Sequence, residues 1–189
     1  MMVYQMKKII LLPAFILMVA AQLYFPLRLV LDSETILDTG KPYKFRTASV
    51  YPLSPVQGSY ILLTYYDNVV QVDSTSEWTQ NEAIYVGLRV DSAGFAAIDY
   101  VSKEIPQPNT DYVKAFVDYV IEDSLSSSLV IRYPFNRFYL EATPKSADRP
   151  VYPYPQTDST TITYATITVK AGEAIITDVL VNDISIKTQ

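Results

Sequence analysis

The chain begins with an uncharged run that is long enough to cross a lipid bilayer. Residues 9–27 (IILLPAFILMVAAQLYFPL) carry no charged side chain over 19 positions. A helix of that length spans the hydrocarbon core of a membrane, which is roughly 30 Å thick. Lys7 and Lys8 precede the run, whereas acidic residues follow it from Asp32 onward. Because basic flanks tend to stay in the cytoplasm, the sequence predicts a single-pass membrane protein with a cytoplasmic N-terminus and a periplasmic or extracellular C-terminal domain.

Two other interpretations of this run stay open. A cleaved signal peptide would end near Val19-Ala20-Ala21, where the side chains are small enough for a signal peptidase. Apolar residues continue past Ala21 to Leu31, however, and cleavage would leave an apolar start of the mature chain. A buried helix of a globular core is the third interpretation, but two lysines rarely stand directly before such a helix. We therefore expect a membrane anchor over residues 1–31, with residues 9–27 in contact with the lipid bilayer.

The composition excludes several classes of function. The chain contains no His and no Cys, which removes the usual ligands of zinc, haem and iron–sulfur clusters. A formal net charge of −5 argues against a nucleic-acid partner, because binding to phosphates needs a basic surface. Asp67, Asp73 and the aspartates within residues 91–99 lack the D-x-D-x-D-G spacing of a calcium loop. We therefore expect no cofactor, no metal site and no identifiable catalytic residue.

The part of the chain after the anchor has the pattern of an all-β protein. It is rich in Tyr and Pro and poor in Gly, which favours strands joined by stiff connections. In residues 111–121 (DYVKAFVDYVI) the apolar side chains recur at every second position, so the pattern favours a strand over a helix. The other strand-like segments are residues 43–50, 59–66, 83–90, 95–101, 129–133, 138–142, 161–169, 174–181 and 184–187.

Several of these segments match one another at a nearly fixed offset. The matches are residues 60–64 with 139–143 and 85–90 with 164–169, at an offset of 79, and residues 94–98 with 172–176, at an offset of 78. The pattern predicts an internal duplication, although short strands also resemble one another by composition alone. Each half is too small to bury a core by itself. We therefore expect two similar small β units, residues 32–105 and residues 106–189, that pack together.

A group of polar and aromatic side chains forms a candidate binding rim. Arg137 and Glu141 are four positions apart, so on one strand they share a face. With Asn136 and Arg132 nearby they are suited to bind carboxylate or carbohydrate oxygens, or else form an ion pair between the two halves. The tyrosines and phenylalanine of the neighbouring segments either line an aromatic groove or pack in the core: Tyr60, Tyr65, Tyr66, Tyr133, Phe135 and Tyr139. The rim that we predict consists of Tyr60, Tyr65, Arg132, Asn136, Arg137, Tyr139 and Glu141.

One motif resembles the signature of a known family. Residues 58–65 (GSYILLTY) resemble the G-D-Y-x-x-L-x-Y pattern that names the uncharacterised bacterial GDYXXLXY family of membrane-anchored proteins. Residues 39–47, 134–141 and 172–181 are similar to further stretches of that family. The chain departs from the pattern at Ser59, where the family has Asp. The family has no established activity, so the resemblance implies a location and an architecture only.

These observations favour a binding or assembly component of an envelope membrane complex, whose partner is an integral membrane protein. One alternative is a Ser-Lys hydrolase with the layout of a signal peptidase, because Ser54-Pro55-x-x-Gly58 follows an N-terminal anchor. Such an enzyme needs a lysine to activate the serine, and Lys103, Lys114 and Lys145 are available in the sequence. A purely structural envelope domain is the other alternative.

Overall fold

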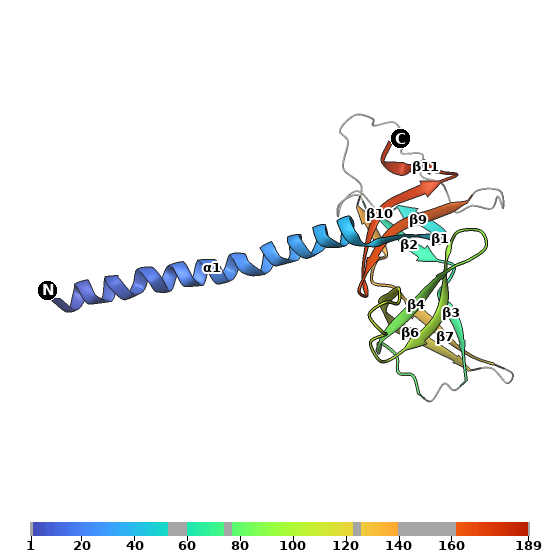
Figure 1. Ribbon diagram of the computed structural model, residues 1–189, viewed down its shortest axis with the longest axis horizontal. Coiled ribbons are helices and arrows are strands. Elements are labelled where there is room, and N and C mark those ends of the chain that lie inside the picture. The colour runs from blue at the N-terminus through green and yellow to red at the C-terminus, as the bar shows by residue number, and fades with distance from the viewer. Residues whose placement is uncertain (1, 53–59, 74–76, 123–125, 140–161, 189) are drawn as a thin grey trace. The chain divides into compact units, whose positions relative to one another are not determined.

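The protein consists of a long helix and a β body (Figure 1). The structure is a computed structural model that describes residues 2–52, 60–73, 77–122, 126–139 and 162–188. The chain divides into two compact units, residues 1–39 and residues 40–189. Each unit is described by itself below.

The first unit is the helix α1, Met2–Thr39. Its segment Phe15–Thr39 has a mean hydropathy of 1.6 and is not buried against the chain, so it is long and apolar enough to cross a membrane. A signal sequence near an N-terminus has the same properties. The helix also continues past Leu31 to Thr39. In this last part the hydroxyl groups of Ser33 and Thr35 donate hydrogen bonds to carbonyl groups four residues earlier.

The second unit contains two antiparallel sheets, which confirms the predicted all-β class. The first sheet has the order β11-β10-β9-β1-β2-β8, and the second has the order β3-β7-β6-β4-β5. The strands are β1 Lys41–Pro52, β2 Tyr60–Tyr65, β3 Val69–Val72, β4 Ala83–Val90, β5 Ala96–Ser102, β6 Tyr112–Glu122, β7 Ser127–Arg132, β8 Arg137–Tyr139, β9 Thr163–Lys170, β10 Glu173–Val181 and β11 Ile184–Ser185, followed by the 3-10 helix η2 Ile186–Thr188.

The strand prediction for residues 111–121 is confirmed by β6. Val113, Ala115 and Val117 are buried at alternate positions, so their side chains share the face that packs on the core. The two sheets share one hydrophobic core, in which the largest fully buried side chains are Phe45, Ile61, Ile84, Leu129, Ile167, Val86, Val113, Val117 and Val179.

The chain crosses twice between the sheets. After β1 and β2 in the first sheet it continues as β3 at the edge of the second, and after β6 and β7 in the second sheet it continues as β8 next to β2 in the first. The strands of the two halves correspond in order, β1 with β6, β2 with β7, β3 with β8, β4 with β9 and β5 with β10. When each strand is exchanged for its counterpart, the order of one sheet becomes the order of the other, apart from β11. Strands from both halves of the sequence thus build both sheets.

Residue pairing follows the same correspondence. In the first sheet, Leu62 of β2 pairs with Arg137 of β8. The residue 68 positions after Leu62 is Val130 of β7, the residue 68 positions before Arg137 is Val69 of β3, and these two residues pair in the second sheet. In the hairpins, the Leu88↔Ile98 pair of β4 and β5 corresponds to Ile167↔Ile176 of β9 and β10 at the predicted offsets of 79 and 78.

One predicted match of the repeat is wrong. Tyr60 and Tyr139, which the offset of 79 made equivalent, are cross-strand partners on the antiparallel neighbours β2 and β8. By the register of the sheets, Tyr60 instead corresponds to Ser128 of β7. The reason is the double crossing, which places the third strand of each half beside the second strand of the other half.

The crossings are held by reciprocal hydrogen bonds. The Leu63 amide donates to the Asn136 carbonyl over 2.8 Å, and the Ile131 amide donates to the Asn68 carbonyl over 2.7 Å. The Tyr65 hydroxyl donates to the Phe135 carbonyl over 2.6 Å, and the Tyr133 hydroxyl donates to the Asp67 carbonyl over 2.9 Å.

An aromatic cluster surrounds these bonds. Phe45, Tyr65, Tyr133 and Phe135 have ring centroids between 5.1 and 5.7 Å apart. Burial raises the pKa of the Tyr65 and Tyr133 hydroxyls far above the ordinary value, because ionisation would place a charge in an apolar site.

The first prediction concerns the Tyr133 hydroxyl. Tyr133→Phe keeps the ring but leaves the Asp67 carbonyl without this donor, so we expect a loss of about 1–2 kcal/mol in the free energy of unfolding. Tyr139→Phe is the matched control, because Tyr139 is 66% exposed, and it should change stability by less than about 0.5 kcal/mol. Urea unfolding of the full chain in detergent micelles measures both values. Equal effects of the two variants would contradict the role given to the crossing.

The second prediction follows from the raised pKa values of Tyr65 and Tyr133. Below the pKa of an unfolded tyrosine, about 10, both states hold the proton and the stabilisation is fully present. At higher pH the unfolded state releases protons that the folded state retains, so stability should fall as the pH rises. Urea midpoints measured between neutral and alkaline pH should fall less steeply in Tyr133→Phe than in the parent chain. Parallel pH profiles would overturn the assignment.

The third prediction compares two glycines at corresponding hairpin turns. Gly94 and Gly172 have φ angles of +86° and +87°, so alanine at either position should cost about 1–2 kcal/mol in backbone strain. A Cβ on Gly172 would also lie 2.7 Å from the Tyr112 ring, whereas a Cβ on Gly94 would meet no atom within 4 Å. Gly172→Ala should therefore lower the melting temperature more than Gly94→Ala does. Equal melting temperatures for the two variants would show that the Tyr112 ring yields freely, and the reverse order would contradict the assignment.

Candidate functional site

The structure brings three of the predicted rim residues together. Tyr60 on β2 and Tyr139 on β8 have ring centroids 5.7 Å apart, and the Arg137 guanidinium lies 5.7 Å from the Tyr60 ring centroid. Arg137 and Tyr139 are exposed, and β8 is the edge strand of the first sheet. We call Tyr60, Arg137 and Tyr139 the edge patch. Its rings and guanidinium provide a surface that can stack on a flat or cationic group of a partner.

The other predicted rim residues lie elsewhere or outside the described part of the chain. Arg132 is on β7 in the second sheet, where it donates a hydrogen bond to the Asn81 side chain over 2.7 Å and lies 3.5 Å from the Asp118 carboxylate. Tyr65 is buried in the aromatic cluster. Asn136 serves the crossing through its carbonyl group. Glu141 lies outside the described residues, so the Arg137–Glu141 pairing stays a prediction.

The predicted aromatic groove is divided in the same way. Tyr133 and Phe135 are buried beside Tyr65, which confirms the core-packing interpretation for these three rings. Tyr66, by contrast, is 65% exposed. The alternation of side chains along a strand explains the difference, because neighbours such as Tyr65 and Tyr66 point in opposite directions.

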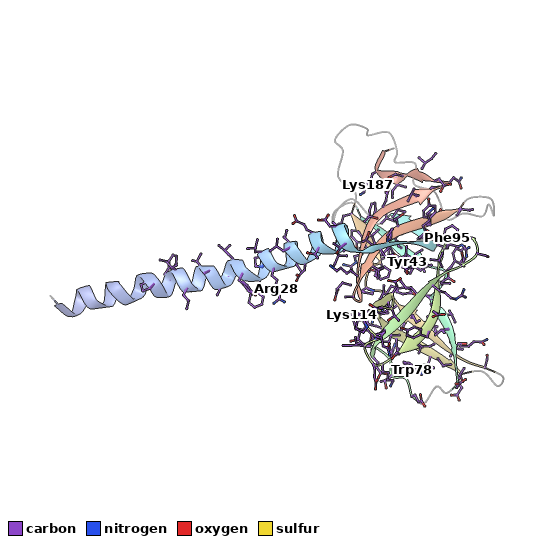
Figure 2. The ribbon with its side chains drawn as sticks, in the orientation of Figure 1. Arg28, Tyr43, Trp78, Phe95, Lys114 and Lys187 are labelled. Carbon is purple, nitrogen blue, oxygen red and sulfur yellow. The ribbon has the colours of Figure 1, made fainter. Side chains whose placement is uncertain are left out.

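Ion pairs join each sheet to the other. Asp111, just before β6, accepts hydrogen bonds from the Lys41 ammonium over 2.6 Å and from the Tyr43 hydroxyl over 2.7 Å. The hydrogen bond from Lys41, followed by the smaller effect of the one from Tyr43, lowers the pKa of the Asp111 carboxyl. Figure 2 labels Tyr43 on the ribbon.

The two main hairpins are held by corresponding pairs. Arg46 on β1 contacts the β4–β5 turn, with 2.9 Å to the Asp91 carboxylate and 4.2 Å to the Phe95 ring centroid. Lys114 on β6 contacts the β9–β10 hairpin, with 2.5 Å to the Glu173 carboxylate. Because each cation is already engaged with the opposite sheet, these pairs stabilise the β body, and we assign them no ligand.

A groove opens between the two edge strands of the second sheet, β3 and β5. Its volume is about 360 Å³, and we call it the β3–β5 groove. The lining residues are Val70, Gln71, Val72, Asp73, Glu77, Trp78, Asp99, Tyr100 and Val101. Trp78 is the only tryptophan of the chain, and Figure 2 places it at the opposite end of the β body from Lys187.

The groove combines an apolar floor with carboxylates. Val70, Val72, Val101 and Trp78 are partly buried and pack on the hydrophobic core. Asp73, Glu77 and Asp99 are exposed, and no basic side chain among the described residues forms an ion pair with them. This arrangement is suited to a ligand that is apolar along its length and carries a positive charge.

Lys103 lies beside the groove and is already engaged. Its ammonium lies 5.2 Å from the centroid of the Trp78 ring, donates to the Glu77 carbonyl and is 2.8 Å from the Glu82 carboxylate. The hydrogen bond from the Lys103 ammonium, followed by the one from the Thr79 backbone amide, lowers the pKa of the Glu82 carboxyl. The charge of Lys103 is therefore satisfied by Glu82, outside the groove.

Sequence reasoning missed the groove. Its residues come from two strands that are far apart in the sequence and from the segment before β4, so no local spacing marks them. The one available signal was the sole tryptophan next to Glu77 in an acidic stretch. Within the described residues, no group of three acidic side chains is placed to hold a metal ion. Ser54 and Lys145 of the hydrolase alternative lie outside the described residues.

The family signature has a structural role in the described positions. Tyr60 belongs to the edge patch, whereas Leu63 and Tyr65 are buried and provide an amide and a hydroxyl donor at the crossing. The spacing of the Leu and Tyr in the pattern thus matches two positions on the same face of β2.

Comparison with known proteins agrees with the resemblance of the motif. The model of the family described as GDYXXLXY protein matches residues 22–179. No curated protein and no solved structure matches the chain. Since the family model covers most of the sequence, this chain belongs to the GDYXXLXY family.

Proposed function

We propose that the protein is anchored in a membrane by α1 and that its β body, on the outer side, is a binding component of an envelope membrane complex. The observation that carries this proposal is the separate apolar helix. Its segment Phe15–Thr39 is not buried against the chain, and an apolar helix without a protein cover is stable in lipid. The basic residues Lys7 and Lys8 before the apolar run favour the orientation with the N-terminus inside.

The edge patch and the β3–β5 groove support a binding role. Both lie at sheet edges, where backbone groups and aromatic side chains are open to a partner. An integral membrane protein is the expected partner, because α1 would hold the β body close to such a protein and raise its effective concentration there.

We also propose that the two halves of the β body arose by duplication of one five-stranded unit. The support is the conserved register of corresponding strand pairs and the reciprocal hydrogen bonds of Leu63 and Ile131. In this proposal each half, residues 32–105 and residues 106–189, donates its third strand to the other. Neither half would then have a complete sheet by itself.

The fourth prediction tests the topology with single cysteines. The chain has no native Cys, so a substitution provides the only thiol. Tyr66→Cys, at a position that is 65% exposed, should react with a membrane-impermeant maleimide on intact cells. Val3→Cys should react only after permeabilisation. Protection of Tyr66→Cys in intact cells would contradict export of the β body.

The same variants separate an anchor from a cleaved signal. The Val3→Cys thiol should remain in the mature, detergent-extracted chain, since an anchor keeps residues 1–31. A mature chain that begins after Ala21 by mass spectrometry would show a cleaved signal peptide instead.

Photo-crosslinking tests the edge patch. A photo-crosslinking residue at Tyr139 should join the β body to a membrane protein, whereas one at the exposed Val90 should not. Crosslinking at both sites or at neither would contradict the role of the edge patch.

A further inference from the structure

We propose that the β3–β5 groove binds an extended peptide segment with a basic side chain from a partner protein. The inference rests on the proposed binding function and names its ligand class. The first sheet has a corresponding pair of edge strands, β8 and β10, and the gap between them is already filled.

In the first sheet, the C-terminal segment of the chain spans the gap. This segment, residues 184–188, consists of β11 and η2. β11 pairs with β10 through Leu180↔Ser185 and Val181↔Ile184. The Lys187 ammonium then donates to the Thr177 carbonyl on β10 over 2.7 Å and lies 5.3 Å from the Phe138 ring centroid on β8. One short segment, a two-residue strand followed by a 3-10 turn that carries one lysine, thus reaches both edge strands.

The corresponding positions of the second sheet line the open groove. By the registers of the strand pairs, Thr177 corresponds to Asp99 and Phe138 corresponds to Val70. Both Asp99 and Val70 line the β3–β5 groove. Among the described strands, β5 pairs with β4 alone. The second sheet therefore presents the site that residues 184–188 occupy in the first sheet, without an equivalent β11.

The side chains of the groove favour a basic segment. In the first sheet, the Lys187 ammonium meets the backbone carbonyl of Thr177. At the corresponding position of the second sheet, an incoming lysine would also meet the Asp99 carboxylate, and Asp73 and Glu77 line the same groove. Opposite charges across a partly buried contact favour both the rate and the orientation of binding. Lys103 already lies over the Trp78 ring, so the indole offers an apolar contact to the methylene groups of such a side chain, and the carboxylates receive its charge.

The backbone favours an extended segment over a small cation. Within the part of the chain that the structure describes, no strand pairs with the outer edge of β5, and the peptide groups of such an edge are satisfied by a strand that binds by β-augmentation. Alternate side chains of that strand would then point to the apolar floor of the groove. In the first sheet the corresponding apolar contact comes from Ile186 of η2, which packs on the core.

The test uses Trp78 as the reporter. It is the only tryptophan, so a change in its fluorescence reports on this groove and leaves the first sheet unseen. The probe is an end-capped peptide with the sequence of residues 184–188, Ile-Ser-Ile-Lys-Thr, added to the full chain in detergent micelles. A second peptide has glutamate in place of lysine. We expect saturable binding of the lysine peptide and affinity for the glutamate peptide that is lower by about tenfold or more.

Charge reversal in the protein gives the matched comparison. Asp99→Lys should abolish binding of the lysine peptide and allow binding of the glutamate peptide. Glu122→Lys, which reverses an exposed charge outside the groove, should behave as the parent chain does. Asp99→Asn, the milder change, should give intermediate affinity, and circular dichroism of each variant checks the fold.

Three results would overturn the inference. The first is the absence of a saturable change in Trp78 fluorescence, and the second is equal affinity for the two peptides. The third is a concentration-dependent dimer that removes the effect of the peptide, since a second copy of the chain would then occupy the groove. The topology experiment fails or succeeds independently. An exported β body with a silent Trp78 would defeat this inference alone, and a cytoplasmic β body that binds the lysine peptide would defeat the proposed location alone.

Discussion

The β body depends on a reciprocal exchange of hydrogen bonds where the chain passes between its sheets. Tyr65 donates its hydroxyl hydrogen to the Phe135 carbonyl, and Tyr133 donates to the Asp67 carbonyl. Each acceptor follows the end of a central strand, at a point where the backbone leaves one sheet for the other. A buried carbonyl without a donor is costly, so the two hydroxyls make the double crossing compatible with a dry core.

The exchange also creates the difference between the two sheets. Each sheet ends in a short third strand from the opposite half, β8 or β3, and this leaves a gap toward the outer strand of a hairpin. Residues 184–188 close the gap of the first sheet through Lys187. The gap of the second sheet is the β3–β5 groove, where Asp99 replaces Thr177. Among the described residues, a filling segment of this kind is present in the first sheet alone, and we propose that a partner supplies it in the second.

The sequence predicted α1 and most of the strands, but it missed the short strand β3, and it did not predict the crossing. Uncharged residues marked α1, and alternation marked β6. The offset for residues 85–90 agreed with the register because both hairpins stay within one sheet. The Tyr60–Tyr139 equivalence failed because a strand exchange leaves no trace in local pattern. For the same reason Tyr65 was assigned to a surface rim, and the groove, which joins β3 to β5, was missed.

Amide hydrogen exchange at the two crossings tests the central claim most directly. The amides of Leu63 and Ile131 donate to the backbone carbonyls of Asn136 and Asn68, and these bonds extend the β2–β8 and β7–β3 ladders at the points where the chain has just crossed from the other sheet. If the reciprocal bonds hold the β body together, both amides open only with global unfolding and share one free energy of opening. NMR of the full chain in micelles should therefore find them among the slowest amides, with equal dependence on added urea. Rapid exchange at either one, or separate opening of the two sheets, would contradict this account.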